Sequence, residues 1–183
     1  CLSNLKQLAF AVVTYSDDNN GRFPNARISC SQPDWSGSQG TFKWVYPEQG
    51  SLFRYVRSVR VYRCSTDFGT PAASITEIPA GLTNRDYPLS YSMNTDFWNN
   101  GPILASSLAR TKEVLMLIHE SRAIINDGDY NWHATKPDIP SNVHNGGTTV
   151  VYVDTHANWR NYGQLMQAYS QGQWSANWQR TPP

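Results

Sequence analysis

The chain has 183 residues, of which 39% are hydrophobic, 13% aromatic and 16% charged, and its formal net charge is +1. This length fits one domain with a buried core. The near-neutral charge argues against a nucleic-acid partner, because binding to phosphates normally requires a basic surface.

Four arginines recur at every third residue between Arg54 and Arg63. Apolar residues separate them, so we interpret them as a solvated face and not as a nucleic-acid site. The longest apolar run, at residues 114–118, is far shorter than the roughly 20 residues that a membrane-spanning helix needs. The sequence therefore predicts a globular part without a membrane segment of its own.

The first predicted element is an amphipathic helix over residues 1–20. Its apolar stripe has spacings of three and four residues and comprises Leu2, Leu5, Leu8, Val12 and Tyr15. Gly21 suits the left-handed position that follows a helix, and Pro24 prevents continuation. The helical pattern is already established at Cys1, so we expect an upstream half of this helix, removed by processing or truncation.

Residues 21–183 are predicted to form a globular head that makes a single domain with the helix. The stretch 25–50 is loop-like, and its large side chains should anchor it on the core: Trp35, Trp44, Val45 and Tyr46. Next, the sequence predicts a short helix at 52–58, an extended piece at 59–64 and turns over 65–88.

The second half of the chain predicts an antiparallel sheet. The expected elements are strands at 89–94 and 113–119 (the latter central), a long loop at 126–147, a hairpin of 148–153 with 156–159, and a short helix at 164–169. The hairpin would turn tightly at Asp154 and Thr155. The predicted fold class is α+β, with the N-terminal helix packed on an antiparallel sheet with long loops.

The three cysteines are Cys1, Cys30 and Cys64, and an odd number cannot pair completely. In an exported protein we expect one disulfide that includes Cys64, with Cys30 or Cys1 as its partner. Three free thiols are the alternative. No C-x-x-C pair supports a zinc-finger or thioredoxin-type site.

One candidate metal site combines His144, Asp154 and His156, with Glu120 as an additional candidate. Asp154 and His156 are two residues apart on a predicted strand and so point to the same side. Two imidazoles and a carboxylate suit zinc. The alternative is a hydrogen bond from His144 to Asp154 that fixes the loop entering the hairpin.

A second candidate metal site is the loop containing Asp127 and Asp129, whose oxygen ligands would suit calcium. The alternative is a solvated turn in which an Asp side chain bonds its own backbone.

Most of the seven tryptophans lie in loop-like sequence. Trp174 and Trp178, in a polar tail, are the best candidates for an exposed pair that stacks on sugar rings. The alternative is that the tryptophans fill the core of a loop-rich head.

No catalytic constellation is evident. The chain has no G-x-S-x-G nucleophile motif, and no local signature marks a cysteine nucleophile. We therefore expect a protein that is not an enzyme.

Four stretches carry a resemblance to a known family. They are CLSNLKQL at residues 1–8, which includes Asn4 and Gln7 and leads into DDNNGRFP at 17–24; VYRCSTD at 61–67; SYSMN at 90–94; and HNGGTTVVYVD at 144–154. In this order they resemble bacterial type IV pilin-like proteins, the type II secretion pseudopilins and related prepilin-type proteins with a C-terminal H-x9-D-G motif. Thr155 replaces the glycine of that motif, which argues against a type I′ turn there.

The resemblance implies that residues 1–20 are the C-terminal half of a pilin-type N-terminal helix. The implied function is a structural subunit, a pseudopilin or minor pilin, that is exported and membrane-anchored in full-length form. Its partners would be other pilin subunits, contacted through the apolar upstream helix. The alternatives are an exported module that binds polysaccharide through exposed aromatics, and a lipoprotein acylated on Cys1.

Overall fold

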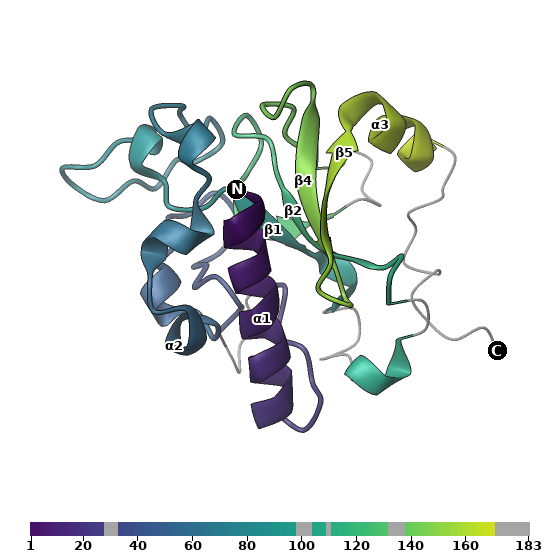
Figure 1. The fold of residues 1–183 in the computed structure, drawn as a ribbon. Coiled ribbons are helices and arrows are strands. Elements are labelled where there is room, and N and C mark those ends of the chain that lie inside the picture. Colours follow the sequence, from purple (N-terminus) through teal and green to yellow (C-terminus); the bar gives the residue numbers. More distant parts are fainter. Residues whose placement is uncertain (28–32, 98–103, 109–110, 132–137, 171–183) are drawn as a thin grey trace.

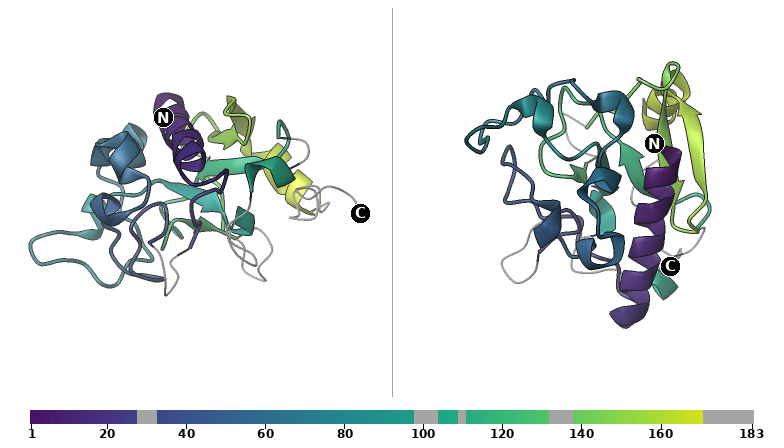
Figure 2. Two further views of the ribbon diagram at one scale, coloured as in Figure 1. Left: turned by 90° about the horizontal axis from the view of Figure 1, so that it is seen from below. Right: turned by 60° about the vertical axis from the view of Figure 1, so that its left-hand side comes forward.

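The protein folds as an N-terminal helix laid across one face of a β-sheet, as its computed structural model shows (Figure 1). The structure describes residues 1–27, 33–97, 104–108, 111–131 and 138–170. Viewed from below, the helix lies on one side of the sheet and the loop-rich middle segment lies beside both (Figure 2). The predicted α+β class is confirmed.

Helix α1 (Leu2–Asp18) buries the centre of the predicted stripe against strands β2, β4 and β5, whereas Leu2 at its beginning is exposed and Tyr15 is half-buried. Leu5, Leu8 and Val12 are fully buried. After the helix, Gly21 takes a φ of 76°, and its N–H donates to the carbonyl of Ser16 at 2.8 Å. This is the predicted left-handed helix stop. Among the described residues, no helix has both the length and the apolar character needed to cross a bilayer.

The sheet of the described residues has five strands in the order β3-β1-β2-β4-β5. The strands are β1 (Tyr91–Asn94), β2 (Leu115–His119), β3 (Asp129–Tyr130), β4 (Gly147–Tyr152) and β5 (Ala157–Asn161). All neighbours pair antiparallel except β1 and β3, which are parallel. Strand β2 is central and wholly buried, as its apolar sequence predicted.

Two predictions about local structure were wrong. Residues 59–64 do not form an extended piece, because Val59–Tyr62 is a 3₁₀ helix. The predicted loop 126–147 contains the short edge strand β3. The short helices were predicted correctly and are α2 (Phe53–Val56) and α3 (Tyr162–Ser170).

Large aromatic side chains anchor the loop-rich middle segment, as expected. Trp35 is fully buried, stacks on Tyr62 at 5.7 Å between ring centroids, and donates its indole N–H to the carbonyl of Gly128 at 2.9 Å. Trp44 packs edge-on against Tyr87 at 5.6 Å. These contacts join a segment with little regular structure to the core that α1 and the sheet share.

The β4–β5 hairpin turns through Val153, Asp154 and Thr155. The N–H of Thr155 donates to the carbonyl of Tyr152, and Thr155 has a φ of 70°. Asp154 is not among the residues with positive φ, so the turn is not type I′, in line with the expectation. A three-residue loop whose last residue is left-handed normally has glycine there, and here a β-branched residue occupies that place.

Candidate functional site

The candidate site lies where the start of α1 meets the sheet. Cys1, the residue that precedes α1, forms a disulfide with Cys64, and their Cα atoms are 5.1 Å apart. Three further side chains form a series of contacts that reaches this disulfide through His144. They are Asp67 from the 3₁₀ helix Ser65–Asp67, His119 at the end of β2, and His144 in the loop before β4.

A chain of polar contacts joins these groups. His119 Nε2 lies 2.8 Å from Asp67 Oδ2, and His119 Nδ1 lies 3.1 Å from His144 Nε2. His144 Nε2 is in turn 3.5 Å from the Sγ of Cys64. Asp67, His119 and Cys64 are fully buried, whereas His144 is half-buried and gives the cluster contact with solvent.

The ionised carboxylate of Asp67 fixes the tautomer of His119. Burial alone would raise the pKa of Asp67, but the hydrogen bond from His119 and the nearby positive charges hold this pKa below its usual value. The carboxylate therefore accepts the Nε2–H of His119. A neutral His119 then presents a lone pair at Nδ1, and that lone pair faces His144.

His144 favours its neutral form. Burial first, and then the neighbouring His119, lower its pKa from the usual histidine value. At neutral pH its Nε2 can donate to His119, or, in the other tautomer, offer a lone pair toward the sulfur atoms. The cluster therefore holds two imidazoles, a carboxylate and a disulfide in one partly enclosed place.

Backbone interactions place each of these side chains. The side-chain amide of Asn4 donates to the carbonyl of Arg63 at 2.8 Å, which ties α1 to the Cys64 segment. The Cys64 N–H donates to the hydroxyl of Ser90 at 3.0 Å. Strand pairing sets Tyr91 opposite His119, and their rings meet edge-on at 5.5 Å. Of the two predicted motif residues in α1, Asn4 is thus a structural contact, whereas Gln7 is exposed and bonds only within its helix.

The loop that carries His144 depends on glycine. A Cβ on Gly147 would lie 2.4 Å from the carbonyl oxygen of Arg160 and 2.5 Å from the ring of Trp159, so no other residue fits there without movement. The Trp159 indole N–H donates to the carbonyl of His144 at 2.7 Å. The start of the hairpin therefore holds His144 toward the disulfide.

The predicted cluster of His144, Asp154 and His156 is wrong. His144 precedes β4 and Asp154 follows it, and a strand of this length separates its ends by roughly 20 Å. Asp154 instead pairs with His156 at 2.5 Å on the exposed hairpin turn. The alternative bond between His144 and Asp154 is ruled out by the same separation. Glu120 is buried elsewhere and bonds the hydroxyl of Ser92.

The predicted calcium ligands Asp127 and Asp129 bind protein groups. Asp127 Oδ1 accepts the N–H of Asp129 at 3.0 Å, which is the Asx turn considered as the alternative, and its Oδ2 accepts from Thr41. Asp129 forms an ion pair with Arg27 at 3.1 Å. Calcium binding here stays a prediction.

The disulfide settles one cysteine alternative. Because a sulfur atom forms a single disulfide, the pairing of Cys64 with Cys1 makes the pairing of Cys64 with Cys30 wrong. Cys30 itself lies outside the described residues, as do the predicted ligand-binding residues Trp174 and Trp178.

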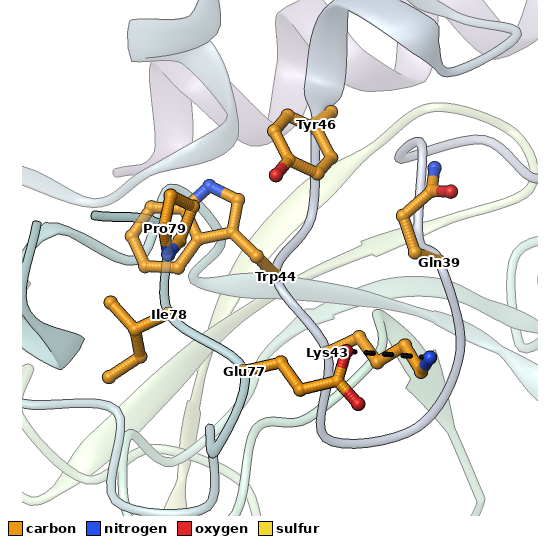
Figure 3. Close-up of a pocket in the computed structure, with 7 residues that line it drawn as sticks. All are labelled: Gln39, Lys43, Trp44, Tyr46, Glu77, Ile78 and Pro79. Carbon is orange, nitrogen blue, oxygen red and sulfur yellow. Dashed lines mark ion pairs between the residues drawn. The ribbon is translucent and has the colours of Figure 1, made fainter.

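A separate pocket of about 330 Å³ opens on the middle segment (Figure 3). An exposed ion pair between Lys43 and Glu77, at 3.4 Å, lines it together with Trp44 and Tyr46. The remaining lining residues are Gln39, Ile78 and Pro79. The pocket combines apolar rings with polar groups.

Sequence reasoning missed His119, Asp67 and the role of Cys1 in the candidate site. A histidine closing an otherwise apolar strand was the available signal for His119, since a buried histidine requires polar partners. No family model, curated protein or solved structure matches the chain in the comparisons made.

Proposed function

We propose that this chain is the head of a pilin-like structural subunit, a pseudopilin or minor pilin, in a type II secretion-like or type IV pilus-like assembly. The four ordered motifs that resemble that family support this role. So does the fold, in which a long N-terminal helix lies on an antiparallel sheet.

The observation that carries the proposal is the outward flank of α1. Leu2, Phe10 and Val13 lie within about 80° of one another around the helix, and they are 38%, 62% and 37% exposed. Helices on globular proteins normally turn polar residues outward. An apolar flank on a helix whose other face is fully packed suits contact with a neighbouring copy, because burial of apolar surface stabilises association.

The disulfide supports the same role. Cys1 and Asn4 fasten the beginning of α1 to the head. A helix that joined neighbouring subunits would need such a fixed connection to hold its head in a defined orientation. The bond also fits an exported protein, since disulfides persist in oxidising compartments.

The first test reads the coding sequence upstream of Cys1. The proposal expects a short basic leader, a prepilin-type cleavage site and about 20 apolar residues. A lipoprotein signal or an unrelated domain at that place would contradict it.

The second test uses the full-length protein in its host membrane, with a photoreactive phenylalanine analogue at Phe10. We expect cross-linked dimers and higher ladders of the protein. Phe42 is the matched control, because it is another exposed phenylalanine, at 47%, far from α1 in the chain. Equal cross-linking from both positions, or from neither, would count against assembly through this flank.

A second candidate function is an exported module that binds polysaccharide, and the pocket of Figure 3 favours it. Aromatic rings beside polar groups are typical of sugar sites, and Tyr46 is partly exposed at the pocket's edge. Retention on immobilised polysaccharides should fall severalfold on Tyr46→Ala and stay unchanged on Phe68→Ala, which removes an exposed ring elsewhere. No retention of the wild type would exclude the module.

A further inference from the structure

The groups around the Cys1–Cys64 disulfide have the composition of a metal site. Among the described residues, one set of three His, Cys or carboxylate ligand atoms lies within 4.8 Å of one another, and it consists of Cys1, Cys64 and His144. We propose that reduction of this disulfide creates a site for a thiophilic transition-metal ion, zinc or monovalent copper. His119 lies outside this set of three but next to His144, and it would have to move toward the sulfur atoms to become the fourth ligand of a Cys₂His₂ site. The inference is independent of the assembly role.

The spacing around His144 fits such an ion. The Sγ of Cys64 and the Nε2 of His144 are 3.5 Å apart. In a tetrahedral zinc site, sulfur at about 2.3 Å and nitrogen at about 2.0–2.1 Å from the metal lie roughly 3.5 Å from each other. The nitrogen atoms of His144 and His119 are 3.1 Å apart, close to the separation of two nitrogen ligands in such a site.

The second imidazole has a reason to be a ligand. Once His144 Nε2 gives its lone pair to a metal, it cannot donate a hydrogen bond to His119 Nδ1. Because Asp67 holds the proton of His119 on Nε2, the buried Nδ1 lone pair would be left facing the ion without a partner. Binding to the metal ion gives this lone pair a partner.

Asp67 then occupies an outer-shell position. A carboxylate that accepts the distal N–H of a ligating histidine orients the ring and increases its basicity, as in many zinc sites. The hydrogen bond from His119 to Asp67 is already present, at 2.8 Å. This half of the site is therefore organised before any metal binds.

The chemical steps balance with a dithiol or phosphine as the reductant. The sulfur–sulfur bond accepts two electrons and two protons, which yields the thiols of Cys1 and Cys64, and the reductant is oxidised. A divalent ion then displaces both thiol protons and binds two thiolates. A small-molecule disulfide can reoxidise the pair: it takes two electrons from the two thiolates and two protons from water, leaves as two thiols, and the re-formed disulfide releases the ion. Half-buried Cys1 and His144 leave a way in.

The experiment titrates cobalt(II) and zinc(II) into the protein without oxygen, in a Cys30→Ser background so that Cys1 and Cys64 are the remaining thiols. After reduction and removal of the reductant, we expect one equivalent of cobalt per chain, with thiolate-to-cobalt charge transfer and the visible bands of a tetrahedral site. The oxidised protein should show neither.

Variants assign the ligands. Competition with a chromogenic chelator should show at least a tenfold loss of zinc affinity on His144→Ala and on His119→Ala, and about a tenfold loss on Asp67→Asn. His156→Ala is the matched control, because that histidine lies on the hairpin turn, and it should leave the affinity unchanged. No metal bound to the reduced protein, or equal affinity in His144→Ala, would overturn the proposal.

Reduction could also unfold the chain, and that result remains informative. In that case, zinc added to the reduced protein should restore the near-ultraviolet circular dichroism of the folded state. It should not do so for His144→Ala. If zinc restores neither protein, or restores both, the site does not exist as proposed.

Discussion

Asp129 carries a buried carboxyl group beside a second carboxylate. Burial, and then the charge of Asp127, raise its pKa to about 7, although Arg27 bonds one of its oxygens. The folded state therefore binds a proton that the unfolded chain, with an ordinary aspartate pKa near 4, gives up. Stability from this group is present at low pH and is lost as the pH rises through about 7.

The first prediction follows from this loss of stability with rising pH. Between pH 5 and pH 8 the free energy of unfolding of the wild type should fall. In Asp129→Asn this fall should be smaller, by about 1–2 kcal/mol. Urea unfolding at a series of pH values measures it. A residual slope is expected, because burial also raises the pKa of Asp34 to about 7 and of Asp138 to about 6.

The exposed Asp17→Asn is the control for this measurement and should leave the slope as it is. An Asp129→Asn slope equal to that of the wild type would show that this carboxyl does not titrate in the expected window.

At the same scale, His119 shows what a sequence alone could not provide. In the sequence, His119 stands out only as a polar residue at the end of an apolar strand. Its partners come from positions 52 residues earlier and 25 residues later in the chain. No local pattern encodes such distances, because the disulfide and the strand register bring these residues together. His144 was found through its motif, but its predicted neighbours Asp154 and His156 were wrong for the same reason.

At the scale of elements, the β4–β5 hairpin carries a local strain. Thr155 has a φ of 70°, in the left-handed region that β-branched residues avoid. The geometry of the hairpin imposes this conformation, since the N–H of Thr155 closes the turn on Tyr152. Glycine would adopt it without steric cost.

The second prediction is that Thr155→Gly stabilises the protein by about 1 kcal/mol. Thr155→Asn should give a smaller gain, because asparagine tolerates the left-handed region better than threonine. Thermal and urea unfolding measure both. A loss of stability in the glycine variant would mean that the threonine side chain contributes more than its backbone strain costs.

Some elements could be predicted from the sequence and others could not, for a physical reason. The helix over 1–20 was predicted correctly because its apolar residues repeat over several turns, and the central strand because it is a continuous apolar run. The hairpin was predicted correctly as well, although its second strand is mostly polar. The two-residue strand β3 has no room for a pattern. The segment 59–64 alternates like a strand, yet it buries Val61 and Tyr62 from a 3₁₀ helix.

At the scale of the whole molecule, the Cys1–Cys64 bond closes a loop spanning a sequence separation of 63 residues. That loop contains α1 and much of the loop-rich middle segment. A cross-link over such a loop restricts the unfolded chain and typically stabilises by about 2–4 kcal/mol.

The third prediction concerns that bond. In a Cys30→Ser background and with a chelator present, Cys64→Ser should lower the free energy of unfolding by about 2–4 kcal/mol. Cys30→Ser alone should change it little. Peptide mapping without reduction should recover Cys1 and Cys64 in one linked pair of peptides. Recovery of a Cys30–Cys64 peptide pair would contradict the structure.

The same bond also decides how the molecule would carry a mechanical load. Tension applied to the chain at Cys1 passes through the covalent bridge directly to Cys64. The chain between these residues, including α1 and the segment around Trp35, is bypassed and carries no tension. Their hydrogen bonds and packing could not be unzipped from that end while the bridge is intact. Cutting the bridge with a reductant would put α1 in series with the force, so its detachment from the sheet would become the first yielding step.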